Sequence, residues 1–352
     1  MTVRFPITGE IGGDLVGMAL AELRLCKVER KETVVLFTDT RTNPNYVSAF
    51  LAAGKELGGS IFEVKVPFLP DGEGRSVDLA PVIRILKSAN FIVDLSTGSI
   101  LYIYGQALTE VLAGATRVLQ VKANEDQLRR CFPTEEVRQR TARGAACLEK
   151  ATDIRLTSKA GSDLRMRKKG RAGLTQLGIS DVKGRWDSWP SGFLYCAPEE
   201  ETANGVLVLD VGDLLVMLGR YVTEPVRITV ENGAIKRIDG GVDAVLLKDR
   251  LEQAGDPEAY IISHIGWGTD RRARWSEIAQ RGTEEGAREV RSTYGNIQIA
   301  FGANYRLGGK NKTMAHEDLI LRRARFELDG KTIVDDGRII PEELRRPGRI
   351  PT

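Results

Sequence analysis

Residues 33–66 read TVVLFTDTRTNPNYVSAFLAAGKELGGSIFEVKV, in which two apolar runs enclose a helical pattern. The first run, residues 33–37, is continuous and rich in β-branched side chains, which is typical of a strand. Residues 45–57 have the spacing of a helix that stops at Gly58 and Gly59, and residues 61–66 return to a strand pattern. Strand, helix and strand at this spacing predict an α/β domain with a mostly parallel sheet.

The same alternation extends on both sides of this stretch. Helices are predicted over residues 10–26 and 79–88, and further strands over residues 91–95 and 118–121. Neither a G-x-G-x-x-G motif nor a Walker phosphate loop occurs in this half, so its sheet alone does not indicate a nucleotide site. A charged helix over residues 135–151 is predicted to link this domain, residues 1–150, to the rest of the chain.

Residues 151–352 have the pattern of a second, β-rich α+β domain. One hairpin is predicted where residues 154–157 and 164–167 flank a Gly-Ser-Asp turn. Another is predicted where residues 226–230 and 234–238 flank Glu231-Asn232-Gly233, because Asn-Gly tolerates the positive φ of a tight turn. A helix over residues 242–254 and strands over residues 297–301 and 316–321 complete the expected pattern.

The charge balance and the hydropathy exclude several classes of partner. The 352 residues include 51 basic and 48 acidic side chains, so the chain is too nearly neutral for a strongly basic nucleic-acid binder. No run approaches 18 uncharged apolar residues, which argues against a membrane partner. The four cysteines form no C-x-x-C pair, and the first residues contain no signal-peptide pattern. We therefore expect a cytoplasmic protein with reduced thiols.

The two histidines of the chain stand in strand-like surroundings. His316 and Asp318 are two residues apart at the start of an apolar run, so a strand would place both side chains on one face. His264 lies between the apolar run 260–263 and the sequence Ile-Gly-Trp-Gly. Two imidazoles and one carboxylate are the facial ligand set of non-haem Fe(II) oxygenases, and they can also hold a catalytic zinc. The alternative is that both histidines are ordinary hydrogen-bonded residues.

Residues 150–330 resemble a superfamily that joins aminopeptidase T-type metalloaminopeptidases with 2,5-dihydroxypyridine 5,6-dioxygenases. The resemblance is carried by five segments in a fixed order: WPSGF at 189–193, ANG at 203–205, HIGWGT at 264–269, GNIQIAFG at 295–302 and NKTMAHED at 311–318. It implies that the metal site lies on the second domain and that the protein is a homo-oligomer.

Departures from the aminopeptidase pattern favour the dioxygenase branch. Phe193, His264 and Gln298 stand where the aminopeptidases have glutamate, glutamate and histidine as metal ligands. Phenylalanine cannot ligate a metal, and a glutamine amide is a poor ligand. The remaining set of His264, His316 and Asp318 matches the mononuclear iron site of the dioxygenases. The resemblance thus implies Fe(II), with zinc or cobalt as alternatives.

The implied reaction is extradiol-type opening of a hydroxylated N-heteroaromatic ring by O₂. The expected substrate is 2,5-dihydroxypyridine or a close relative, and the expected product is of the N-formylmaleamate type. One alternative is a mononuclear metallohydrolase, acting as an aminopeptidase or on an aromatic amine or amide. Another is a non-catalytic member of the superfamily that binds a ligand or serves in an assembly.

Seven further residues are candidates for substrate contact or proton transfer. Tyr305 is a candidate general base, because the aminopeptidase pattern has a tyrosine seven residues after its ligand histidine. Ser188 occupies a position where a histidine is expected in dihydroxypyridine enzymes, so the identity of the ring stays open. The candidate substrate-binding residues are Tyr104, Ser188, Trp189, Ser191, Phe193 and Gln298. For the aromatic members of this set, packing in the core is an equally ordinary role.

Overall fold

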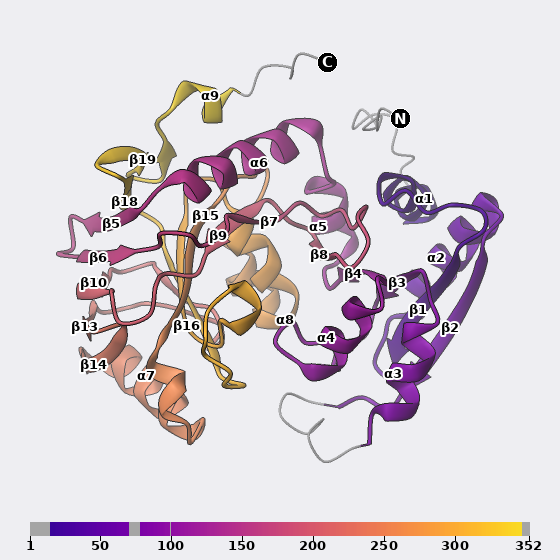
Figure 1. The fold of residues 1–352 in the computed structure, drawn as a ribbon, viewed down its shortest axis with the longest axis horizontal. Helices are drawn as coiled ribbons and strands as arrows, with labels where there is room; N and C mark the ends of the chain where they lie inside the picture. Colours follow the sequence, from indigo (N-terminus) through magenta and orange to yellow (C-terminus); the bar gives the residue numbers. More distant parts are fainter. Residues whose placement is uncertain (1–14, 70–77, 99, 347–352) are drawn as a thin grey trace. The chain divides into compact units, whose positions relative to one another are not determined.

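The computed structural model describes residues 15–69, 78–98 and 100–346 (Figure 1). These residues pack into two compact units, one from residues 1–135 and 177–191 and the other from residues 136–176 and 192–352. These bounds differ from the expected division at residue 150. Helix α6 (Glu135–Lys150) buries Ala145 and Leu148 in the core of the second unit, so nearly all of it belongs to that unit. Residues 177–191 then return to the first unit.

The first unit contains the parallel sheet that the sequence predicts. Its five strands follow the order β2-β1-β3-β4-β8, and all four pairings are parallel. The strands are β1 (Thr33–Asp39), β2 (Ser60–Val66), β3 (Phe91–Asp94), β4 (Arg117–Val121) and β8 (Trp186–Trp189). The helices are α1 (Leu15–Leu25), α2 (Pro44–Leu57), α3 (Ala80–Lys87), α4 (Gln106–Ala113) and α5 (Glu125–Arg130).

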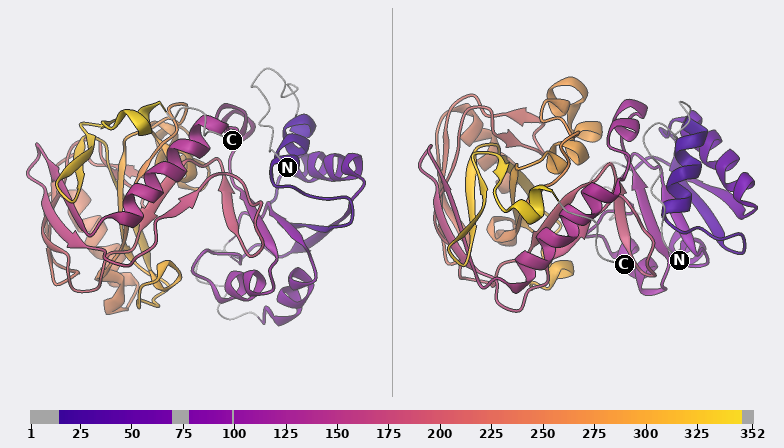
Figure 2. Two further views of the ribbon diagram at one scale, coloured as in Figure 1. Left: turned by 45° about the horizontal axis from the view of Figure 1, so that its top comes forward. Right: turned by 90° about the horizontal axis from the view of Figure 1, so that it is seen from above.

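The helices lie on both faces of this sheet, which explains its continuous apolar strands (Figure 2). Leu36 and Val93 pack on one side with residues of α1 and α2, whereas Phe37 and Ile92 pack on the other with residues of α3 and α4. The predicted first helix begins at Leu15 in the structure, and residues 10–14 lie outside the described part of the chain.

Strand β8 is a feature that the sequence analysis missed. The carboxylate of Asp187 accepts hydrogen bonds from the backbone N–H groups of Leu177 and Gly178, at 2.9 and 3.0 Å, and from Arg185 at 2.6 Å. The buried carboxylate thus links the start of the segment 177–191 to strand β8 within the same segment. Ser188 and Trp189 follow directly, and β8 pairs with β4 at the edge of the sheet.

The second unit is built from two antiparallel sheets. Their strand orders are β14-β13-β10-β6-β5-β18-β19-β20 and β12-β11-β17-β16-β15-β9-β7. The strands are β5 (Asp153–Ser158), β6 (Asp163–Arg167), β7 (Leu174–Gln176), β9 (Phe193–Cys196), β10 (Asn204–Leu209), β11 (Leu214–Leu215), β12 (Arg220–Tyr221), β13 (Val226–Glu231), β14 (Ala234–Asp239), β15 (Ile262–Gly268), β16 (Ile297–Gly302), β17 (His316–Leu321), β18 (Ala324–Leu328), β19 (Lys331–Asp335) and β20 (Arg338–Ile339). The helices besides α6 are α7 (Val242–Gln253), η2 (Pro257–Tyr260), α8 (Glu277–Ser292), η3 (Tyr305–Leu307) and α9 (Glu342–Arg345).

Both predicted hairpins are present. Strands β5 and β6 pair antiparallel, and β13 and β14 pair around Asn232 and Gly233, whose φ angles are 49° and 76°. The predicted helix over residues 242–254 and the two predicted strands correspond to α7, β16 and β17. The main core of this unit contains residues of both sheets, such as Leu156 of β5 and Ile299 of β16. Because side chains alternate along a strand, β15, β16 and β17 turn their other side chains away from this core.

Helix α8 covers part of that second face of the seven-stranded sheet. Val290 of α8 packs in a separate apolar cluster with Leu214 of β11 and Ile320 of β17. The helix is interrupted at Gly282, where φ is 76°, and its sequence is highly charged. The sequence did not indicate this helix, because Gly282 divides it into two short segments that are rich in charged residues.

Two expectations from composition can be compared with the structure. All four cysteines, Cys26, Cys131, Cys147 and Cys196, have free thiols. In the part of the chain that the structure describes, every helix is too short or too polar to cross a membrane.

Candidate metal centre

Strand β17 places His316 and Asp318 on one face, as its period of two predicts. The His316 Nε2 atom lies 3.1 Å from Asp318 Oδ1. Glu317 points to the opposite face, where it pairs with Arg250 of α7. The side chains of His316 and Asp318 are 9% and 1% exposed, so this pair is sheltered from bulk water.

The register of three neighbouring strands brings His264 to the same place. His264 of β15 is opposite Ala300 of β16, and Ala300 is opposite Asp318 of β17. Because Ala300 has a small side chain, His264 Nε2 reaches to 3.6 Å from Asp318 Oδ1. The register also shifts between Ile262 and His264, an irregularity of the kind that redirects side chains near active sites. Together, His264, His316 and Asp318 offer three ligand atoms within 4.8 Å of one another.

The protonation of His264 suits a metal ligand. Burial lowers its pKa to about 3, and the nearby His316 and Arg291 act in the same direction. The imidazole is therefore neutral at pH 7 and has one nitrogen lone pair to offer. Its Nδ1 atom has no hydrogen-bond partner among the described residues. A neutral imidazole beside a carboxylate oxygen is a donor set that a divalent cation fits.

Asp318 is held as a carboxylate by its neighbours. Burial alone would raise its pKa, but the Arg291 guanidinium and the imidazole of His316 outweigh that effect and hold the pKa well below its usual range. Arg291 Nη2 donates to Oδ2 at 2.5 Å, and Gln298 Nε2 donates to Oδ1 at 2.5 Å. Both oxygens are thus oriented by side chains from other elements, α8 and β16.

An aromatic pair on β9 borders the three residues. Phe193 and Tyr195 stack with their ring centroids 5.0 Å apart and their planes at 12°. The Tyr195 ring lies 5.1 Å from the imidazole of His264, and the Phe193 ring lies 6.1 Å from it. The sequence analysis selected Phe193 but missed Tyr195. The period of two along a strand could have found it, because residues 193 and 195 share a face.

The structure places the other predicted residues as follows. Gln298 joins the cluster through Asp318, whereas Tyr305 lies in the short helix η3, within the loop between β16 and β17. Tyr104, Ser188, Trp189 and Ser191 belong to the first unit.

Within the first unit, Trp189 is fully buried and meets the Phe132 ring edge-on at 5.4 Å. Tyr104 is buried against Tyr102. The hydroxyls of Ser188 and Ser191 have no hydrogen-bond partner among the described residues.

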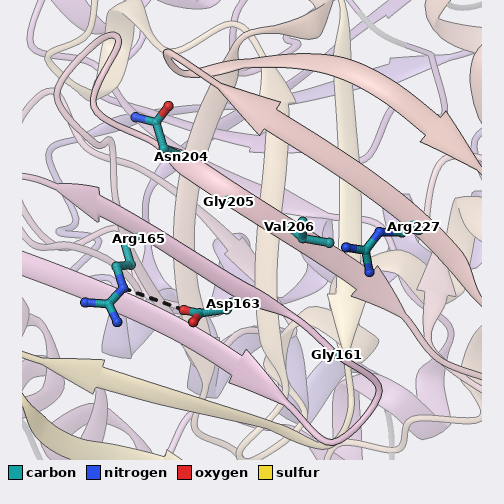
Figure 3. Close-up of a pocket in the computed structure, with 7 residues that line it drawn as sticks. All are labelled: Gly161, Asp163, Arg165, Asn204, Gly205, Val206 and Arg227. Atoms are coloured by element: carbon teal, nitrogen blue, oxygen red, sulfur yellow. Dashed lines mark ion pairs between the residues drawn. The ribbon is translucent and has the colours of Figure 1, made fainter.

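A separate hollow of about 410 Å³ lies on the surface of the eight-stranded sheet (Figure 3). Its lining residues are Gly161, Asp163, Arg165, Asn204, Gly205, Val206 and Arg227. Asp163 pairs with Arg155 at 2.8 Å and lies 3.7 Å from Arg165, on a solvent-exposed face. These charges stabilise one another at the surface, and the hollow contains none of the predicted site residues.

Comparison with known proteins identifies the family. The sequence model of the family described as 2,5-dihydroxypyridine 5,6-dioxygenase matches residues 14–341. The chain belongs to the 2,5-dihydroxypyridine 5,6-dioxygenase family. A curated 2,5-dihydroxypyridine 5,6-dioxygenase from Pseudomonas putida strain KT2440 is 32% identical over 337 residues, which cover 92% of this chain and 95% of the relative.

Solved structures agree with this dioxygenase family. The 2,5-dihydroxypyridine dioxygenase structure from Pseudomonas putida KT2440 matches with a TM-score of 0.88 and 32% identity, covering 94% of this chain and 98% of the other. Wild-type AmpT from Thermus thermophilus matches with a TM-score of 0.66 at 13% identity, covering 93% and 99% of the two chains. The second match shows a shared fold, in keeping with the superfamily resemblance found in the sequence.

Besides Tyr195, Arg291 is a residue beside the three candidate ligands that the sequence did not indicate. It lies in the last turn of α8, a helix whose sequence is charged throughout. No local pattern separates Arg291 from the many other arginines of the chain. Its role depends on α8 packing over β17, which the sequence alone did not predict.

Proposed function

We propose that this protein is a mononuclear Fe(II) dioxygenase that opens 2,5-dihydroxypyridine, or a close relative, with O₂. Its product would be of the N-formylmaleamate type. The observation that carries the proposal is the cluster of His264, His316 and Asp318 on one face of the seven-stranded sheet, with ligand atoms within 4.8 Å. Membership of a ring-cleaving dioxygenase family supports the same assignment.

His264, His316 and Asp318 would hold the iron. Fe(II) held by these residues would supply the means to bring O₂ and an electron-rich ring together. The protein contributes a neutral imidazole at His264 and a carboxylate that Arg291 and Gln298 fix in place. Pre-oriented ligands of this kind need little rearrangement when the metal binds.

The aromatic pair Phe193 and Tyr195 would position the substrate ring. Both side chains are nearly fully buried, and both rings lie beside the imidazole of His264. Planar aromatic surfaces favour stacked or edge-on contact with another ring, and they exclude water from it. Ser188, Ser191, Trp189, Gln298 and Tyr104 remain proposed substrate contacts.

Tyr305 is the proposed general base for the substrate hydroxyl. The two histidines of the chain both belong to the metal cluster, so a third imidazole is absent from the sequence. A phenol can transfer a proton when it lies within hydrogen-bond reach of the reacting group. Tyr305→Phe would lower the rate of ring opening while leaving iron affinity unchanged, if the tyrosine moves this proton.

The proposal is tested by loading the metal-free protein with Fe(II) under anaerobic conditions and then adding 2,5-dihydroxypyridine and O₂. We expect one O₂ to be consumed per ring, with loss of the ring absorbance, and neither change in His316→Ala. Lys236→Ala, an exposed replacement on β14, serves as the matched control and should behave like the unmodified protein. Tight zinc binding at the same residues without oxygen uptake on any hydroxylated ring would favour the metallohydrolase instead.

We also propose that the protein forms a homo-oligomer in the cytoplasm. The support is the superfamily resemblance for the assembly, and the sequence pattern for the location. Light scattering of the purified protein, which gives its mass in solution, tests the first. A mass equal to that of one 38.8 kDa chain would contradict it.

A further inference from the structure

A fourth, charged side chain, that of Arg291, contacts the cluster of His264, His316 and Asp318. A facial set of two neutral imidazoles and one carboxylate has a net charge of −1. Here Arg291 forms an ion pair with the carboxylate, with Nη2 2.5 Å from Asp318 Oδ2. With both imidazoles neutral, as metal ligation requires, Asp318, His264, His316 and Arg291 together would have a net charge of zero. A divalent cation bound there keeps an excess of two positive charges, rather than one.

Burial makes this extra charge effective. The side chain of Arg291 is 16% exposed and that of Asp318 is 1% exposed, so solvent screens the pair weakly. Glu317, the adjacent carboxyl, points to the other face of the sheet and pairs with Arg250. It therefore does not offset the charge of Arg291.

Arg291 also has a free donor. Its Nη2 atom contacts Asp318, but its buried Nε atom has no hydrogen-bond partner among the described residues. A guanidinium offers five N–H groups in a rigid plane, so one group can hold a carboxylate and still act on a second anion. Arg291 thus cancels the charge of the only carboxylate among the three proposed ligands, and its Nε atom keeps unused hydrogen-bonding capacity.

We propose that Arg291 makes the metal centre selective for anionic ring ligands over neutral ones of the same shape. The inference rests on the proposed function, because it assumes a metal at His264, His316 and Asp318. It assigns to Arg291 a specificity role for this reaction, which is to favour the ring whose hydroxyl has lost its proton. The sequence has no third histidine that could remove the proton of the substrate hydroxyl. A preference for the ring that has already lost this proton lessens the need for such a base.

The test compares two probes that differ in charge but hardly in shape. Picolinate and picolinamide both chelate a metal through a pyridine nitrogen and an oxygen, but picolinate has a negative charge and picolinamide is neutral. Their dissociation constants would be measured by calorimetry on the zinc-loaded protein, in which no oxidation competes. We expect Arg291→Gln to reduce the preference for picolinate on the order of tenfold, and Arg291→Lys to retain most of it. Arg291→Met provides a second neutral variant, and thermal unfolding checks that each variant is folded.

Zinc alone is titrated first, with His316→Ala as the reference that lacks a ligand. If His316→Ala binds zinc as tightly as the unmodified protein does, the proposed metal centre is wrong and the inference fails with it. If zinc binds at the site but both neutral variants lose affinity for the two probes by the same factor, Arg291 only positions Asp318. The same conclusion follows if the picolinate preference is unchanged, and either result overturns the inference.

Discussion

Two buried aspartates, one in each unit, are held by different kinds of hydrogen-bond donor. Asp39, at the end of β1, accepts hydrogen bonds from the backbone N–H groups of Thr97, Gly98 and Arg41, at 2.7, 2.8 and 2.9 Å, and from the hydroxyls of Thr42 and Thr97. Asp318, on β17, instead accepts from the side chains of Arg291 and Gln298 and faces two imidazoles.

The difference lies in what remains available for a ligand. The backbone donors around Asp39 are fixed in the fold, so that carboxylate anchors a loop to the sheet and is fully used. The side chains around Asp318 orient it but leave Oδ1 beside His264 and His316, at 3.6 and 3.1 Å. A buried carboxylate that is surrounded by side-chain donors and imidazoles is therefore the better indicator of a reactive site.

The largest expected effect is on metal binding at Asp318. Asp318→Asn removes the negative charge that draws a cation to the cluster, so we expect the affinity for Fe(II) or zinc to fall more than a hundredfold, beyond the usual loss for an outer-shell residue. Titration of the metal-free protein measures this. Glu317→Gln, the neighbouring carboxyl on the opposite face, is the matched control and should bind metal normally. Equal losses in both variants would contradict the assignment.

The anchoring role of Asp39 predicts a loss of stability instead. Asp39→Asn replaces one acceptor oxygen by an amide that cannot accept from the backbone, which should cost about 2 kcal/mol in the free energy of unfolding. Urea denaturation of the metal-free protein gives this value. Zinc affinity should stay the same as in the unmodified protein. An Asp39→Asn variant that is as stable as the unmodified protein but binds zinc more weakly would contradict the purely structural role of Asp39.

Gln298 tests whether the donors around Asp318 matter individually. Gln298→Leu removes the hydrogen bond to Oδ1, and we expect metal affinity to fall roughly tenfold, as is typical for groups that orient a ligand. The same titration measures it, with Gln176→Leu on β7 as a control of similar burial in the same sheet. Unchanged affinity in Gln298→Leu would show that Arg291 alone is sufficient to hold the carboxylate.

The last prediction concerns the pH dependence of stability, which does not involve the metal cluster. Burial raises the pKa of Asp213 to about 6, so the folded state retains a proton that the unfolded chain releases near pH 4. This contribution favours folding below about pH 4 and is lost as the pH rises to about 6.

The pKa of Asp39 is lowered: burial opposes the shift, but hydrogen bonds from the backbone of Gly98, Arg41 and Thr97 outweigh it. The stability from Asp39 is therefore present above about pH 4 and lost below it, which is the opposite sign. Relative to the unmodified protein, Asp213→Asn should gain about 2 kcal/mol in unfolding free energy between pH 4 and pH 7. No change between these pH values would contradict the raised pKa of Asp213.

Local periodicity was sufficient for much of this fold. The β-branched runs and the intervening helix predicted the parallel sheet, and Asn232-Gly233 predicted a hairpin. The spacing of His316 and Asp318 also placed both side chains on one face of a strand, because that inference needs only the period of two.

Long-range features were harder to predict. The meeting of His264 with Asp318 depends on the register of β15, β16 and β17, and β15 is about fifty residues from β17 in the sequence. The resemblance to a known family supplied this link, since strand pairing across such a distance leaves no local pattern. The return of residues 177–191 to the first sheet, and the ion pair from Arg291, depend on tertiary packing in the same way.

The central claim is that this site inserts both atoms of O₂ into the substrate ring. The most direct measurement is a single turnover of the Fe(II)-loaded protein with 2,5-dihydroxypyridine under ¹⁸O₂, with mass spectrometry of the immediately quenched product. We expect a ring-opened product that contains two ¹⁸O atoms, and no such product from His264→Ala. A product with one ¹⁸O atom or none, or equal turnover by His264→Ala, would contradict it.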